Sequence, residues 1–237
     1  MPARTAASLP AAIPYQFLHI GKTGGTLIRQ VLGSLPEEHR LRFRLLGHDV
    51  RLPDAIESRP AMPVFFSVRR PETLFVSAFN SRLRQGRPEY DRPWNRRERI
   101  AFSVFRAPNE LAEALSADDP TLRACAELSM LSINHVRKGL RWYLRGPDCL
   151  DQHRDQIAFI LLQEELERDL RTFAERAGVP LDAARISPGE RLHASIPADE
   201  TALSETGLEN IRQWYRPHQE IYDWCERFHD RLVSRAG

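Results

Sequence analysis

The stretch Phe17–Leu32, FLHIGKTGGTLIRQVL, contains the change of pattern that decides the fold. An apolar run, Tyr15–Ile20, leads into a glycine-rich turn, as expected of a buried strand that enters a loop. After the turn, apolar residues recur at the spacing of one helix face until Pro36 ends the pattern; they are Leu27, Ile28, Val31, Leu32 and Leu35. A strand, a tight loop and a helix in succession are typical of the start of an α/β domain.

Further segments repeat this alternation of strand and helix. Val64–Val68 and Ile157–Leu162 are apolar runs of the length expected for buried strands, and Leu41–Leu46 is a weaker candidate. Pro71 suits the first turn of a helix behind the first of these runs, and Gly178 marks the end of a helix behind the second.

The order of these segments predicts an α/β fold, a single domain over residues 15–235 with a central, mostly parallel sheet flanked by helices. Residues 85–150 break the alternation and are predicted to be a helical insertion that contains the acceptor region. Residues 1–14, rich in alanine and proline, are expected to be extended or disordered.

Composition excludes several classes of protein. Of 237 residues, 42% are hydrophobic and 28% charged, as in soluble globular chains, and the net charge of +2 is too small for a general nucleic-acid binder. Three cysteines, Cys125, Cys149 and Cys225, lie too far apart for a disulfide framework or a cysteine zinc site. No apolar run approaches the roughly 18 residues of a membrane span. We therefore expect a cytoplasmic protein with no membrane span and no nucleic-acid partner.

The segment His19–Thr26, HIGKTGGT, is predicted to bind an anion. Backbone N–H groups of a glycine-rich turn at a helix N-terminus attract negative charge, and Lys22, one of only two lysines, adds a cation. The segment is not the nucleoside-triphosphate motif GxxxxGK[ST], because Gln16 stands where the first glycine must be. Tight packing alone also explains such a turn, and that interpretation stays open at this point.

A second polar segment follows the strand Val64–Val68. In VRRPETLFVSAF, Arg69 ends the strand and Ser77 lies about two turns into the next helix. Open α/β sheets bind ligands at the carboxyl ends of their strands, and an arginine fork suits a phosphate. The sequence thus predicts a second anion contact at Arg69, with Arg70 exposed to solvent.

These two segments resemble the nucleotide-binding motifs of sulfotransferases. HIGKTGGT is similar to the family's 5′-phosphosulfate loop, commonly PKTGGT or PKSGTT, and RRPxxxxxS is similar to its 3′-phosphate motif. Gly47-His48 is similar to the Gly-His-Val-like segment of enzymes resembling heparan sulfate 2-O-sulfotransferase, a carbohydrate-type member. Segments 163–167 and 191–195 are similar to later elements of the family. Gly21 departs from the pattern, because the carbohydrate-type enzymes usually have proline there.

The resemblance implies a P-loop-like sulfotransferase fold and transfer of a sulfuryl group to a hydroxyl of a carbohydrate or related small acceptor. The donor would be 3′-phosphoadenosine 5′-phosphosulfate and the product adenosine 3′,5′-bisphosphate, with no metal. Lys22 and His48 would be catalytic, the histidine as general base. The nucleotide would be held by residues of both motifs and of a late loop: Lys22, Thr23, Gly24, Gly25, Thr26, Arg69, Ser77, Arg191, His193 and Ser195.

Two other functions stay open. A nucleotide kinase or other phosphoryl transferase could use the glycine-rich loop, although VFFSVRR and IAFILLQ lack the aspartate that would bind magnesium after a strand. A binding protein could keep the nucleotide site without catalysis, although Lys22 and His48 are both present. The arginines between residues 82 and 99 could attract an acceptor, or form a solvated surface that is paired with nearby carboxylates.

Overall fold

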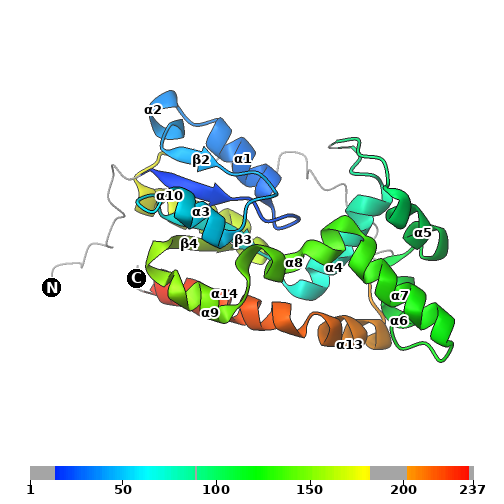
Figure 1. Cartoon of the computed structure of the whole chain (residues 1–237). Helices are drawn as coiled ribbons and strands as arrows, with labels where there is room; N and C mark the ends of the chain where they lie inside the picture. Colours follow the sequence, from blue (N-terminus) through cyan, green and yellow to red (C-terminus); the bar gives the residue numbers. More distant parts are fainter. Residues whose placement is uncertain (1–13, 89, 182–201, 235–237) are drawn as a thin grey trace. The chain divides into compact units, whose positions relative to one another are not determined.

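A computed structural model describes residues 14–88, 90–181 and 202–234 of the chain (Figure 1). As the sequence predicts, the architecture is α/β, with a four-stranded parallel sheet flanked by helices. The described residues divide into two compact units: 14–69, 143–181 and 220–234 form the first, and the remainder forms the second. Within these ranges no helix is both long and apolar enough to cross a membrane.

The first unit is built on the sheet, whose strands all run parallel in the order β2-β1-β3-β4. They are β1 (Tyr15–Leu18), β2 (Phe43–Leu45), β3 (Val64–Val68) and β4 (Ile157–Leu162). Each apolar run that predicted a strand therefore forms one, although β1 stops before Ile20 and β2 is shorter than predicted. β1 and β3 are buried along their whole length and pair with Phe17 opposite Phe65, so the centre of the sheet is also the centre of the core.

Helices cover both faces of this sheet. Those of the first unit are α1 (Gly25–Gly33), α2 (Glu37–Arg40), α3 (Leu52–Ser58), α9 (Pro147–Gln152) and α10 (Leu166–Ala177), with the 3₁₀ turns η1 (Arg154–Gln156) and η2 (Gln163–Glu165). Apolar side chains of α1 and α10 pack in one cluster with Phe17, Phe65 and Phe159. Gln16 faces the other way, because successive strand residues alternate, and its side-chain amide donates to the Ala55 carbonyl of α3 at 3.0 Å. α1 and α3 therefore lie on opposite faces of β1.

The last helix, α14 (Arg216–Ser234), starts in the second unit and continues into the first. His229 Nε2 lies 3.0 Å from Asp169 Oδ1 of α10, and Asp169 Oδ2 accepts a hydrogen bond from Leu162 N–H at 2.8 Å. Burial lowers the pKa of His229, but its hydrogen bonds to Asp169 and Asp230 outweigh this effect and raise the pKa. Cys225, four residues earlier, is buried, and burial raises the pKa of its thiol.

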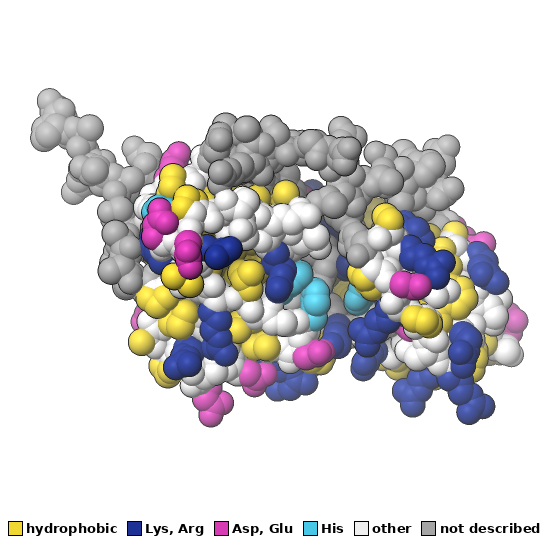
Figure 2. All heavy atoms as spheres, turned by 90° about the horizontal axis from the view of Figure 1, so that it is seen from above, with side chains coloured by type: hydrophobic (Ala, Val, Ile, Leu, Met, Phe, Trp, Pro, Cys, Tyr) yellow, Lys and Arg dark blue, Asp and Glu magenta, His cyan; other side chains and the backbone are white. Residues whose placement is uncertain are grey.

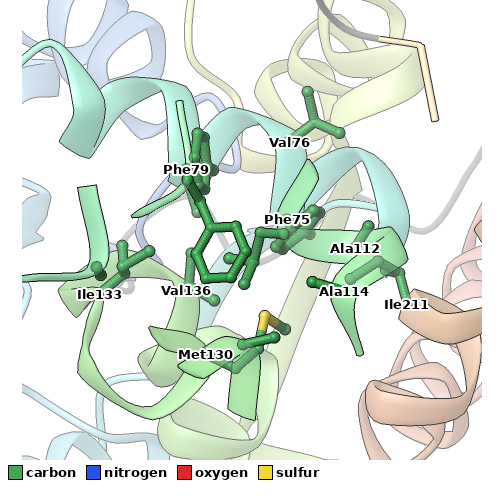
Figure 3. Packing of buried hydrophobic residues seen from close by; sticks show 14 of the residues in the cluster. Phe75, Val76, Phe79, Ala112, Ala114, Met130, Ile133, Val136 and Ile211 are labelled. Carbon is green, nitrogen blue, oxygen red and sulfur yellow. The ribbon is translucent and has the colours of Figure 1, made fainter. Parts of the chain in front are cut away.

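The second unit contains helices and no strand among its described residues. They are α4 (Pro71–Leu83), α5 (Arg96–Val104), α6 (Pro108–Ala114), α7 (Pro120–Ser132), most of α8 (Asn134–Leu144), α13 (Glu205–Trp214) and the start of α14. Their core lies around Phe75 and Phe79 of α4. Figure 3 shows these two rings among apolar side chains from the other helices, including Met130 of α7 and Ile211 of α13.

An ion pair is buried in this second unit. Arg82 Nε lies 2.7 Å from Glu98 Oε1, and only 2% of each side chain is exposed. The Glu98 carboxylate also accepts hydrogen bonds from the backbone N–H groups of Asn95 and Asn134, each at 3.1 Å. One carboxylate therefore joins α4 to the first turns of α5 and α8.

We expect Glu98→Ala to lower the free energy of unfolding by about 3–5 kcal/mol, because the substitution leaves the Arg82 guanidinium buried without its counter-charge. Arg87→Ala is the matched control, since it removes an exposed pair in which Arg87 lies 3.0 Å from Asp91. Exposed pairs contribute little, so the control should keep the wild-type urea midpoint. Equal shifts of the midpoint in the two variants would show that burial of the pair does not matter.

Candidate functional site

The candidate site lies in the first unit, where the connections of the sheet change direction. The chain leaves β1 through α1 to reach β2 on one side, then returns through α3 to β3 on the other side of β1. Such a topological switch point is where open α/β sheets bind ligands. The loop 19–24 follows β1 and Arg69 follows β3, so the two predicted anion contacts belong to the carboxyl ends of neighbouring strands.

The loop presents backbone donors at the start of α1. Gly24 is the N-cap residue, with φ of 89°, and no side chain caps the helix. The hydrogen-bond ladder of the helix begins with Ile28 N–H, which donates to the Gly24 carbonyl at 3.2 Å. The amides of Gly25, Thr26 and Leu27 therefore precede the ladder, and together with the helix dipole they favour an anion. Lys22 lies in the same turn with φ of 67°, a left-handed conformation.

Thr23 braces this loop from inside the protein. Its side chain is fully buried, and its hydroxyl donates to the Ile20 carbonyl at 2.9 Å and contacts the Ser67 hydroxyl at 2.8 Å. The hydroxyl is thereby engaged within the fold, whereas the side chain of Thr26 is exposed. Of the two threonines predicted to bind the nucleotide, Thr26 is thus the one whose hydroxyl a ligand can reach.

Both loop glycines are sites of close approach. A Cβ atom on Gly24 would lie 2.5 Å from Leu166 Cδ2, and one on Gly25 would lie 2.1 Å from His19 Cδ2 and Nε2. The tight-packing interpretation of the glycines is therefore confirmed. It does not compete with the anion-binding interpretation, because the same close packing brings the first turn of α1 to the end of β1.

Two histidines meet beside this turn. His19 is buried and follows β1, while His48 is exposed and follows β2; their ring centroids are 3.8 Å apart. Burial is the largest of the effects that lower the pKa of His19 to about 3, and the positive charges of His48, Arg29 and Lys22 contribute the rest. His19 is therefore a neutral imidazole near neutral pH. The sequence predicted His48 as a site residue, and the structure brings it next to the loop.

Arg69 is half-buried at the end of β3. Burial lowers the pKa of its guanidinium and the nearby Glu164 carboxylate opposes this effect, so Arg69 stays charged. Glu164 belongs to η2 and accepts a hydrogen bond from the Tyr222 hydroxyl at 3.4 Å. The Glu164 carboxylate is thus near the Arg69 guanidinium at this end of the sheet.

Three residues that the sequence did not assign to the site also shape it, although one of them, Glu164, belongs to the segment 163–167 that resembles a later element of the family. Ser67 holds Thr23, Glu164 accompanies Arg69, and the Tyr143 hydroxyl is hydrogen-bonded to the backbone of Gly21. Burial, opposed by that hydrogen bond and reinforced by Asp49, raises the pKa of Tyr143 to about 12. Ser67 had a usable signal, because it is the one polar residue in the apolar strand VFFSV. Tyr143 had none, since its partner is far away in the sequence.

The other predicted residues do not belong to the described part of the first unit. Ser77 is half-buried on α4, in the second unit. Arg191, His193 and Ser195 lie outside the described residues. Glu89, a carboxylate within the arginine-rich stretch, does so as well.

The arginines between residues 82 and 99 separate into two kinds. Arg82 is buried with Glu98, and Arg87 pairs with Asp91 on the surface, as the ion-paired interpretation predicts. The others are exposed: Arg84, Arg92, Arg96, Arg97 and Arg99. Figure 2 shows basic side chains, in dark blue, gathered on the surface of the molecule.

Comparisons with known proteins give no information on the function of this site. No protein-family model, curated protein or solved structure matches the chain. In the part of the chain that the structure describes, no group of three or more His, Cys, Asp or Glu side chains could hold a metal ion.

The contact between Gly25 and the His19 ring makes a prediction about the loop. We expect Gly25→Ala to cost about 1–3 kcal/mol of unfolding free energy, because the added methyl group must displace a packed ring. Gly33→Ala is the control in the same helix: a Cβ there meets nothing within 4 Å, and we expect no loss. Urea unfolding of both variants measures the difference, and an unaltered midpoint for Gly25→Ala would contradict the close contact.

Proposed function

We propose that the chain is a sulfotransferase that moves the sulfuryl group of 3′-phosphoadenosine 5′-phosphosulfate to a hydroxyl of a carbohydrate or related acceptor. The observation behind this proposal is the juxtaposition of the Lys22 loop with the end of β3, fixed by the buried contact between Thr23 and Ser67. This contact holds the anion-binding turn after β1 and Arg69 after β3 at the ends of adjacent strands. A nucleotide with phosphate at both the 5′ and 3′ positions needs two such contacts.

The residues of the site suit that donor. In this proposal the amides of Gly24, Gly25 and Thr26 hold the 5′-phosphosulfate, and Arg69 binds the 3′-phosphate with its fork of donors. The resemblance of both segments to sulfotransferase motifs supports the same assignment. The contact of Ser77 with the 3′-phosphate stays a prediction from the sequence.

Transfer would proceed by in-line displacement at sulfur. The acceptor oxygen forms a bond to sulfur while the bond between sulfur and the bridging oxygen breaks, and the electron pair of that bond stays on the 5′-phosphate. Lys22 would stabilise the charge that grows on the bridging oxygen. Positioned charge of this kind is the main contribution that a protein makes to phosphoryl transfer, and sulfuryl transfer has the same requirements.

His48 is the residue that we propose to accept the proton of the acceptor hydroxyl. Imidazole is the side chain that most often serves as a general base in enzymes. His48 is exposed and could reach an acceptor, whereas His19 is buried and has a pKa of about 3, too low for a useful base. Of the two histidines, the proposal therefore assigns the base to His48.

The donor assignment is tested by titration calorimetry with adenosine 3′,5′-bisphosphate, adenosine 5′-phosphate and ATP. We expect Arg69→Ala to weaken binding of the bisphosphate by roughly 10–100-fold, because charged hydrogen bonds contribute about 1.5–3 kcal/mol. Binding of the 5′-phosphate should change little. Arg171→Ala is the control, since Arg171 is an exposed arginine of the same unit that pairs with Glu167 at 2.7 Å. Preference of the unaltered protein for ATP would favour a phosphoryl transferase instead.

Lys22→Ala tests the chemical step. We expect the variant to keep bisphosphate binding and to lose transfer from the full donor by about 10²–10³-fold in kcat, the usual loss when one preorganised donor is removed. Lys138→Ala changes the only other lysine, on α8, and should retain activity. Transfer by Lys22→Ala at the wild-type rate would mean that its charge is not used in the transition state.

A further inference from the structure

We propose that His19 is a positioning residue that holds the imidazole of His48 in place beside the first turn of α1. This inference rests on the proposed function and adds a residue to which that function gives no role. Its basis is a continuous stack of groups in the first unit, which runs from the core of the sheet through His19 to the exposed ring of His48.

The stack begins in the core. Phe17 of β1 packs against Phe65 with ring centroids 5.2 Å apart, and the His19 ring stacks on Phe17 with centroids 5.6 Å apart and an interplanar angle of 29°. His19 is only 6% exposed. Its outer surface meets the His48 ring at 3.8 Å between centroids. The exposed imidazole thus rests on a ring that the core fixes.

Gly25, in the anion-binding turn at the start of α1, lies against the edge of the His19 ring. The absence of a side chain lets the His19 ring approach the start of α1 so closely that a Cβ would come within 2.1 Å of it. The same ring therefore touches both the backbone proposed to bind the donor and the imidazole proposed to act as base. His19 fixes the distance between these two groups.

The chemistry of His19 fits this role. Burial, together with the cations around it, keeps its pKa near 3, so the ring is neutral when His48 gains a proton. Two charged imidazoles stacked at this distance would repel each other, and a neutral ring avoids that repulsion. His48 lies between Gly47 and Asp49, in an exposed segment, so the stack restricts a side chain at the surface.

Proton NMR of the free protein tests the contact without any substrate. We expect the ring protons of His48 to lie upfield of their ordinary positions and to show nuclear Overhauser effects to His19. His19→Ala should move the His48 resonances back toward those positions, and His153→Ala, the control at another histidine of the same unit, should leave them unchanged. If His19→Ala does not fold, the Overhauser effects in the unaltered protein decide the matter, and their absence overturns the proposal.

Turnover tests the role. We expect His19→Ala to lower kcat by roughly 10–100-fold while bisphosphate binding stays unchanged, because small displacements of a reacting group cost that much. His19→Phe restores a flat, uncharged ring and should recover most of the loss. A displaced His48 resonance with unchanged kcat overturns the positioning role. If the unaltered protein transfers no sulfuryl group, the proposed function is contradicted. The positioning role of His19 then falls as well, even if the NMR spectra show the contact with His48.

Discussion

The buried hydrogen bond between Thr23 and Ser67 is the contact on which the site depends. Thr23 has one hydroxyl proton and donates it to the Ile20 carbonyl, so Ser67 must be the donor in the bond of 2.8 Å between the two hydroxyls. Both side chains are fully buried, where an unpaired hydroxyl would be costly. The loop after β1 is thereby tied to the carboxyl end of β3, and the location of Lys22 relative to Arg69 follows from that tie.

The glycines beside this hydrogen bond are needed both for close packing and for the proposed anion site. Gly24 has no side chain because Leu166 of α10 occupies that space, and Gly25 has none because His19 does. The second contact places the start of α1 against His19, the residue that follows β1, and the free amides of the first turn of α1 can donate hydrogen bonds to an anion there. Neither glycine can be assigned to stability or to function alone.

Local pattern made most of the fold predictable. β3 and β4 have the bounds of their apolar runs, whereas β1 ends early because the chain turns after Leu18, where Ile20 N–H bonds back to its carbonyl at 3.1 Å. Lys22 and Arg69 were predictable because strand ends and glycine turns have local signatures. The contacts of Tyr143 with Gly21 and of Glu164 with Arg69 were not, since they join residues about 100 positions apart in the chain. A local sequence pattern does not predict contacts between residues so far apart in the chain.

The reactivity of the buried Cys225 thiol reports how often the first unit opens at α14. Its thiol lies on α14, one turn from the His229 that pairs with Asp169, and burial keeps it protonated. Alkylating reagents attack the thiolate, so the residue reacts only in molecules whose C-terminal helix has lifted away. Cys125 and Cys149 are half-buried and would be modified earlier. The difference between the labelling rate of Cys225 and the rates of the other two cysteines therefore measures, in the unaltered chain, how often α14 separates from the rest of the first unit.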